Sequence, residues 1–251
     1  MAIKPSRQCG ERRPRRDRYH RDNIYRRRHG RENAHRVVSE DIARTAGAFR
    51  CLGMHKSLPI VYLARHGETE WSLSGQHTGL TDLPLTPAGE RDAQALGERL
   101  RKLGAADVFT SPLQRARRTC ELAGLMDRAQ VDPDLVEWNY GDYEGLRTSE
   151  IHLDRPGWNI FRDGCPGGES SQDVHARADR VIGRFRAKKG NLIVFSSGHF
   201  LRVLAGSWLG LDSGAGRLWL LGTASLSALG YEHSPDEPVI RFWNDTTHLP
   251  R

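Results

Sequence analysis

The sequence predicts an α/β fold: a three-layer sandwich in which a mostly parallel central sheet is flanked by helices. Short apolar runs typical of buried strands alternate with longer segments of helical periodicity. This alternation favours parallel strands, because each parallel pairing needs a crossover connection. The last two apolar runs have a hairpin-like loop with Gly, Pro and Asp nearby, which predicts an antiparallel pair.

The first predicted elements form two strand–helix units. Pro59–Ala64 is a short apolar run that suits a buried strand. The Ala- and Leu-rich stretch Pro87–Leu103 is a predicted helix, because a proline opens it and Gly104 ends it. Asp107–Thr110 is the second predicted strand, and Pro112–Leu122 is the second predicted helix.

The later elements repeat the alternation once and then change it. Arg177–Lys188 is a predicted helix, and Leu192–Phe195 is predicted to be the most buried strand in the chain. A helix over Phe200–Leu209 follows it. Leu226–Tyr231 and Val239–Trp243 are the two closing strands.

Composition excludes several classes of protein. The 251 residues, 37% of them hydrophobic, are enough for one sizeable core and exclude wholesale disorder. Apolar runs such as Leu218–Leu221 are far shorter than the ~20 residues of a membrane span, and no secretory signal is visible. The four cysteines lie far apart, which predicts free thiols and a cytoplasmic location; they are Cys9, Cys51, Cys120 and Cys165.

The positive charge is concentrated at one end of the chain. Of the net charge of +7, residues 1–55 carry +9 and residues 56–251 carry −2. We expect residues 1–56 to be an arginine-rich, disordered tail and residues 57–251 to be the folded domain. The tail is either a nucleic-acid-contacting arm or a non-native extension, with the true start at Met54. Its acidic residues and its scarcity of serine argue against a transit peptide.

Polar residues gather where three predicted strands end. Arg65 and His66 follow the first strand, Arg115 lies one turn into the helix after the second, and His199 follows the strand Leu192–Phe195. In parallel sheets, ligands bind beyond the carboxyl ends of the strands. Two histidines and two arginines are therefore expected at one edge of the sheet.

These residue types suit phosphoryl transfer. Arginine side chains match phosphate oxygens, and Gly67 and Gly198 let the backbone approach a bound group. A histidine in a cationic pocket stays neutral and keeps a ring nitrogen available as a nucleophile. The sequence contains no common metal-binding motif and no phosphate-binding loop of the Gly-x-x-x-x-Gly-Lys type, so we expect no metal and no cofactor.

The motifs resemble those of the histidine phosphatase, or phosphoglycerate mutase-like, superfamily. The resemblance runs from about Leu58 to the C-terminus and rests on five motifs in the expected order. They are Arg65-His66-Gly67-Glu68-Thr69, Leu85-Thr86-Pro87-Ala88-Gly89, Ser111-Pro112-Leu113-Gln114-Arg115-Ala116, Glu137-Trp138-Asn139-Tyr140-Gly141-Asp142-Tyr143-Glu144-Gly145 and Gly198-His199.

Two further segments resemble one branch of that superfamily, the branch of broad-specificity acid phosphatases and sedoheptulose-1,7-bisphosphatases. They are Trp71–Gly79 and Arg162–Ser170. Ser72 after Trp71, and the short distance from Glu137 to Gly168, both differ from the pattern of the mutase branch.

The resemblance implies a role for each matching residue. His66 is similar to the nucleophile that becomes phosphohistidine. Glu137 is similar to the acid that protonates the leaving alkoxide and then activates water, and Glu144 is the alternative. The residues implied to bind the phosphate or the rest of the substrate are Arg65, Arg115, His199, His77, Thr78, Gly79 and Arg202.

The sequence therefore predicts a metal-independent phosphatase that acts on sugar phosphates or other small phosphomonoesters through phosphohistidine. A phosphoglycerate mutase is the first alternative. A protein that binds nucleic acid through its basic tail is the second. The expected partner is a small-molecule phosphomonoester, with no membrane and no nucleic acid outside the tail; the sequence leaves a homo-oligomer open.

Overall fold

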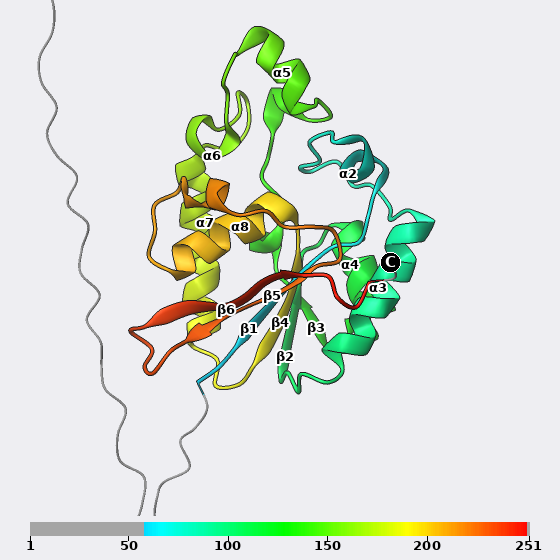
Figure 1. The fold of residues 1–251 in the computed structure, drawn as a ribbon, viewed down its shortest axis with the longest axis vertical. Coiled ribbons are helices and arrows are strands. Elements are labelled where there is room, and N and C mark those ends of the chain that lie inside the picture. Colours follow the sequence, from blue (N-terminus) through cyan, green and yellow to red (C-terminus); the bar gives the residue numbers. More distant parts are fainter. Residues whose placement is uncertain (1–57, 250–251) are drawn as a thin grey trace, which may run out of the picture. The chain divides into compact units, whose positions relative to one another are not determined.

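The structure, a computed structural model, describes residues 58–249. The expected tail of residues 1–56, with Met54, lies outside these residues. One six-stranded sheet organises the described part (Figure 1). Its strands are β1 (Val61–Arg65), β2 (Asp107–Thr110), β3 (Ala129–Val131), β4 (Leu192–Ser196), β5 (Leu226–Tyr231) and β6 (Pro238–Asp245).

The sheet is mostly parallel, as predicted. The strand order is β3-β2-β4-β1-β5-β6, and the first four strands in this order run in one direction. Strand β5 is antiparallel to both β1 and β6, so the closing pair is antiparallel as expected. The central strand β4 is buried along its whole length, because helices cover both faces of the sheet.

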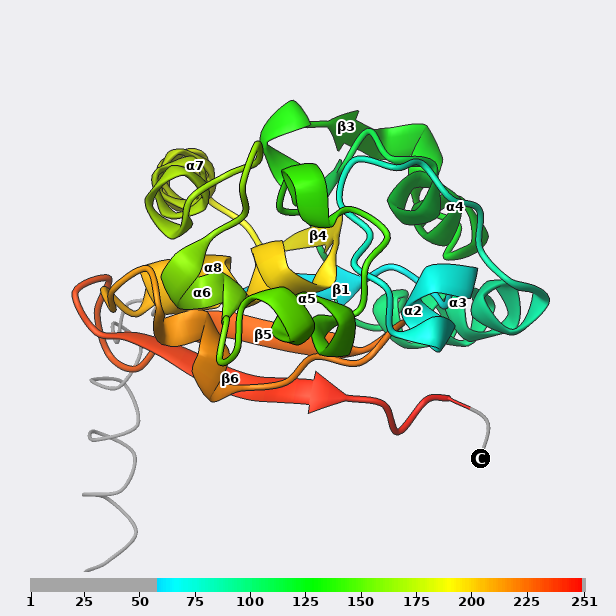
Figure 2. The ribbon, with the colours of Figure 1, turned by 90° about the horizontal axis from the view of Figure 1, so that it is seen from above.

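The helices form two layers on opposite faces of the sheet (Figure 2). One layer consists of α3 (Pro87–Leu100) and α4 (Gln114–Leu122), which pack on Ile193 and Phe195 of β4. The other consists of α7 (Ser171–Arg186) and α8 (Gly198–Trp208), which pack on the residues of β4 that face the opposite side. The three-layer sandwich predicted from the sequence is confirmed.

Three short helices lie beyond the carboxyl ends of the strands and were not predicted. They are α2 (Glu70–Ser74), α5 (Thr148–Asp154) and α6 (Ile160–Asp163) (Figure 1). The loops at α2 and α5 are tied together, since the Gln76 side chain donates to the carbonyl oxygen of Gly145 and Arg147 donates to that of Ser74. These elements enclose the edge at which ligands bind in α/β folds.

Several predicted boundaries are wrong. Helix α7 begins six residues before the predicted Arg177, because Ser170 and Asp173 form a reciprocal capping box. The helix predicted to reach Leu103 ends at Leu100. Strand β3 was missed, since three residues at the edge of a sheet give almost no periodic signal.

Two of the four cysteines lie in the described residues. Cys120 and Cys165 are buried free thiols, and burial raises the pKa of each to about 12. Cys9 and Cys51 lie outside the described residues. Within residues 58–249, we find no helix with the length and apolar character needed to cross a bilayer.

Candidate active site

A pocket of about 250 Å³ opens at the carboxyl ends of β1 and β4. Seven of the nine predicted site residues line it: Arg65, His66, His77, Thr78, Glu137, His199 and Arg202. The two others, Arg115 and Gly79, lie behind its wall. The structure therefore brings together residues that are up to 137 positions apart, as the strand-end rule predicts.

His66 is fixed by the sheet and is neutral. Its backbone N–H continues the ladder of β1 by donating to the carbonyl oxygen of Ser196 at 3.0 Å. Burial first, and then the charges of Arg115 and Arg65, lower the pKa of His66 well below its usual value. Its Nδ1 lies 2.7 Å from the carbonyl oxygen of Gly67, which can only accept a hydrogen bond. Nδ1 therefore carries the proton, and Nε2 keeps a free lone pair.

Gly67 is required by packing rather than by a bound group. A Cβ atom at this position would lie 2.4 Å from the carbonyl oxygen of Gly89. Its N–H donates to Oγ1 of Thr119 at 3.0 Å. The sequence suggested that Gly67 lets the backbone approach a ligand, whereas the structure explains this glycine by close contact between two backbone segments. At Gly198 the added Cβ would lie 3.1 Å from Nε of Arg65.

Arg115 is fully buried and holds the loop in front of it. Its guanidinium donates to the carbonyl oxygens of Thr81 at 2.9 Å, Gly79 at 2.7 Å and Thr78 at 3.2 Å. Nε of Arg115 and Nε of Arg65 are buried and have no hydrogen-bond partner among the residues that the structure describes. Unpaired buried donors beside a pocket are available to an anion.

Glu137 lies at the N-terminus of α8, with only 4% of its surface exposed. Its Oε1 accepts the backbone N–H groups of Phe200 at 2.7 Å and Trp138 at 2.9 Å, and its Oε2 accepts that of His199 at 2.9 Å. The first backbone N–H groups of a helix have no partner within the helix, so a side-chain oxygen at this place satisfies them. Glu137 thus takes the capping role that a side chain at Ser197 usually has.

His199 is held as a hydrogen-bond donor toward the pocket. Tyr140 makes a short hydrogen bond to Nδ1 of His199. Burial raises the pKa of Tyr140 well above its usual value, whereas burial, Arg202 and His77 lower that of His199. The tyrosine hydroxyl therefore keeps its proton and donates it to Nδ1, which leaves the N–H of the neutral ring on Nε2.

His77 and the residues after it form one wall of the pocket. The His77 ring is stacked on Tyr140 at 4.7 Å, and its Nε2 lies 3.2 Å from Oγ1 of Thr148. Burial lowers the pKa of His77 to about 4. Glu144 accepts the N–H groups of Gly79 at 2.8 Å and Thr81 at 3.1 Å. Because Glu144 holds this loop and does not line the pocket, the geometry favours Glu137 as the acid.

Arg202 supplies a further positive charge to the pocket. Its Nε donates to the carbonyl oxygen of Gly216 at 2.9 Å, and its guanidinium lies 4.4 Å from the ring centre of Phe161. Burial lowers the pKa of Arg202 to about 10, so it remains charged at neutral pH. These contacts turn the side chain toward the pocket that it lines.

Several lining residues were not predicted as site residues. Tyr140 lies three positions after Glu137, within a motif already noted, but its contact with His199 is visible only in three dimensions. Thr148 and Leu221 had no signal in the sequence. The other lining residues without a predicted role are Trp71, Ser72, Gly75 and Gln76.

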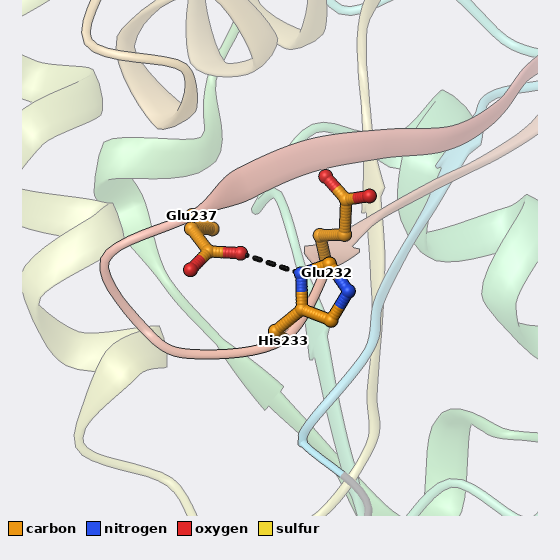
Figure 3. A group of neighbouring side chains, drawn as sticks. All are labelled: Glu232, His233 and Glu237. Atoms are coloured by element: carbon orange, nitrogen blue, oxygen red, sulfur yellow. Dashed lines mark hydrogen bonds and ion pairs between the residues drawn. The ribbon is translucent and has the colours of Figure 1, made fainter.

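One group of potential metal ligands lies away from this pocket, in the turn between β5 and β6. Glu232, His233 and Glu237 are all exposed, and Nδ1 of His233 pairs with Glu237 at 2.8 Å (Figure 3). Because β5 is antiparallel to β1, this turn follows the end of β5 that pairs with the start of β1. The turn therefore lies at the amino-terminal end of β1, whereas His66 follows the carboxyl end of β1.

The fold and the site define a class of enzyme, and comparison confirms it. The chain is a hydrolase of the histidine phosphatase type. Residues 61–246 match the family model described as histidine phosphatase superfamily, branch 1, and the chain belongs to this superfamily. The resemblance inferred from the motifs is confirmed.

Named relatives include both phosphatases and mutases. Sedoheptulose 1,7-bisphosphatase of Saccharomyces cerevisiae is 42% identical over 186 residues, which are 61% of this chain and 68% of the yeast protein. An acid phosphatase of Mycobacterium tuberculosis is 39% identical over 175 residues, 68% of this chain and 86% of that protein. A protein named probable phosphoglycerate mutase GpmB, from Salmonella paratyphi C, is 33% identical over 202 residues, which are 75% of this chain and 94% of that protein.

Solved structures share the fold. The product of an open reading frame of Mycobacterium tuberculosis aligns with a TM-score of 0.70 at 35% identity, over 74% of this chain and 97% of that chain. A mycobacterial glucosyl-3-phosphoglycerate phosphatase aligns with a TM-score of 0.63 at 25% identity, over 74% of this chain and 98% of that chain.

Proposed function

We propose that the protein hydrolyses small phosphomonoesters, among them sugar phosphates, through a phosphohistidine at His66. The observation that carries this proposal is the state of His66. Its Nδ1 proton is held by Gly67, so Nε2 of a neutral, buried ring is free beside two arginines with unpaired N–H groups. A nucleophile and the charge that stabilises a transferring phosphoryl group are thus adjacent.

In the first step, Nε2 of His66 attacks the phosphorus atom and the bond to the ester oxygen breaks. Arg65, Arg115 and the Nε2–H of His199 stabilise the negative charge on the phosphoryl oxygens. Glu137 gives its proton to the leaving alkoxide. The Oε2 atom suits this role, because it accepts one backbone N–H, whereas Oε1 accepts two.

In the second step, water replaces the histidine. The Glu137 carboxylate accepts a proton from the attacking water, a new oxygen–phosphorus bond forms, and the bond from Nε2 of His66 to phosphorus breaks. Inorganic phosphate leaves, and both residues return to their initial protonation states. No step requires a metal, since guanidinium groups and N–H donors supply the positive charge.

The pocket suits a substrate with a second polar or anionic group. Arg202 lines the pocket and would bind a second phosphate, while His77 and Thr78, which also line it, would border the body of the substrate. The name of the yeast relative, a sugar bisphosphatase, supports this substrate class. We also infer a cytoplasmic location, which the buried free thiols of Cys120 and Cys165 support.

The competing function is that of a mutase, which returns the phosphoryl group to an organic acceptor. The test is to offer a labelled phosphomonoester with either water alone or excess phosphoglycerate as the acceptor. The proposal predicts that the label appears as inorganic phosphate in both cases and in no organic product, even where phosphoglycerate competes for the site and lowers the rate. Label transferred to phosphoglycerate, with little release of phosphate, would identify a mutase.

A further inference from the structure

Glu137 is carried by an irregular segment that is not part of a strand or an α-helix. It lies between two short 3-10 turns, Pro133–Leu135 and Gly141–Tyr143, whereas His66 directly follows β1 and His199 lies in the first turn of α8. A residue that transfers a proton must lie within hydrogen-bond distance of the substrate oxygen. Small shifts of this segment would therefore slow the reaction.

Arg177 of α7 binds this segment from behind. Its Nη1 donates to the carbonyl oxygens of Asp134 at 2.8 Å and Val136 at 2.7 Å, and its Nη2 donates to that of Glu137 at 3.2 Å. Its Nε and Nη2 also donate to the Glu169 carboxylate at 3.0 and 2.9 Å. All five N–H donors of a guanidinium are thus used, and the residue is only 6% exposed.

Glu169 binds the two residues that follow Glu137, Trp138 and Asn139. Its Oε2 accepts the backbone N–H of Asn139 at 2.8 Å, and its own backbone N–H donates to the carbonyl oxygen of Asn139 at 2.9 Å. Its carbonyl oxygen accepts Nε1–H of Trp138 at 2.9 Å. The residues on both sides of Glu137 are therefore tied to one ion pair, in which Arg177 is buried and Glu169 is half-buried.

The same ion pair also contacts Phe200, a residue whose backbone N–H holds the Glu137 carboxylate. The Arg177 guanidinium lies 4.5 Å from the ring centre of Phe200. The backbone N–H of Phe200 is the group that donates to Oε1 of Glu137 at 2.7 Å. Arg177 thus contacts both the main chain of Glu137 and the residue that orients its side chain.

We propose that Arg177 and Glu169 form a positioning pair that sets the Glu137 carboxylate for proton transfer. The inference rests on the proposed function. Neither residue lines the pocket, so the pair acts through Glu137 and not by binding substrate. Loss of the pair should slow the steps that need a proton from Glu137 and leave the phosphate-binding residues in place.

The test compares two leaving groups in variants that do not bury an unpaired charge. Arg177→Met alone would strand the Glu169 carboxylate, so the double variant Arg177→Met/Glu169→Gln removes both charges together. An alkyl phosphate needs a proton on its leaving oxygen, whereas p-nitrophenolate leaves largely unaided. We expect kcat/KM to fall roughly 10–10²-fold for the alkyl phosphate, and little for p-nitrophenyl phosphate.

Arg180→Met is the matched control. Arg180 lies one turn further along α7, is exposed, and within residues 58–249 pairs only with the side chain of Asp134, at 2.8 Å. We expect wild-type rates on both substrates. The positioning variants are also combined with Glu137→Gln, and we expect no further loss on the alkyl phosphate, because residues that act through one another are not additive.

The outcomes separate this proposal from the function on which it rests. Equal losses on both substrates, in proportion to a lowered unfolding midpoint, would mean that the pair only stabilises the fold. An additive loss in the combined variant would also overturn the positioning role. If Glu137→Gln itself shows no dependence on the leaving group, the acid role of Glu137 fails, and the positioning proposal fails with it.

Discussion

Glu137 and His199 are joined at the first turn of α8, where Oε2 of Glu137 accepts the backbone N–H of His199 at 2.9 Å. This bond links the proposed acid to the proposed phosphate-binding histidine through the main chain. The two residues therefore hold a constant position relative to each other, although they are 62 positions apart. Proton transfer and charge stabilisation are thereby brought to the same phosphate ester.

Replacement of Glu137 should matter most for poor leaving groups. We expect Glu137→Gln to slow cleavage of a sugar phosphate by about 10²–10⁴-fold, the usual contribution of general acid catalysis. Phosphorylation by p-nitrophenyl phosphate should be much less affected. Hydrolysis of phosphohistidine then becomes slow, so a burst of p-nitrophenol should precede the steady state in stopped-flow measurements.

Glu144 provides the comparison for that experiment. Glu144→Gln weakens the hydrogen bonds to Gly79 and Thr81, so it should reduce both rates by a similar factor. A leaving-group effect at Glu144, with none at Glu137, would exchange the two assignments.

Arg115 should affect all substrates alike. We expect Arg115→Ala to lower kcat by about 10²–10³-fold for sugar and aryl phosphates, since it removes charge stabilisation common to both. It should also lower the unfolding midpoint, because three carbonyl oxygens lose their donor. Arg117→Ala is the control, because Arg117 is on the same helix and exposed. Comparable losses at Arg117 would show that net charge, and not position, is responsible.

Two neighbouring serines should differ in their effect on stability. Oγ of Ser196 donates to the carbonyl oxygen of Leu135 at 2.6 Å, whereas Oγ of Ser197 is buried with no partner in the described part of the chain. Ser196→Ala should lower the free energy of unfolding by about 1–3 kcal/mol, because it leaves a buried carbonyl unpaired. Ser197→Ala should leave it unchanged or raise it. Urea denaturation of both variants measures the difference, and the reverse order would contradict the hydrogen-bond pattern.

The histidines should titrate in a defined order. In spectra of ¹⁵N-histidine-labelled protein at about pH 5, His66 should be neutral with its proton on Nδ1, since its pKa is held well below the usual value. His77, with a pKa of about 4, should also be neutral. The exposed His233 should be protonated, because a hydrogen bond to Glu237 and the nearby acidic charges raise its pKa. A protonated His66 at this pH would contradict its role as a nucleophile.

The lowered pKa values of His66 and His77 also determine how the stability of the fold changes with pH. The folded-state pKa values of His66 and His77 lie below the unfolded value of about 6.5, so the unfolded chain binds more protons below that pH. Their contribution to stability is complete above about pH 6.5 and declines at lower pH, and for His77 the decline runs down to about pH 4. His77→Gln should make this decline shallower.

The sequence predicted residues that follow directly on regular structure. Arg65, His66 and His199 could be placed because parallel strands bring their carboxyl ends to one edge of the sheet. Arg115 could be placed because it lies one turn into the helix after the second strand, and the structure buries Arg115 while it exposes Arg117.

Features that depend on distant contacts could not be predicted in this way. Glu137 was identified through a family motif, since nothing local shows that its segment packs on Arg177 and the start of α8. The contact of Tyr140 with His199 joins a loop residue to the first turn of α8, 59 residues away. The start of α7 is different, because the Ser170–Asp173 capping box is visible in the sequence and was overlooked.

The central claim is that His66 carries the phosphoryl group, and trapping the intermediate tests it most directly. Protein mixed with ³²P-labelled substrate and quenched in alkali should carry label that is stable in base and released by acid. Peptide mapping should place this label on His66, and His66→Ala should remain folded, unlabelled and inactive. Label on another residue, or full turnover by His66→Ala, would contradict the account.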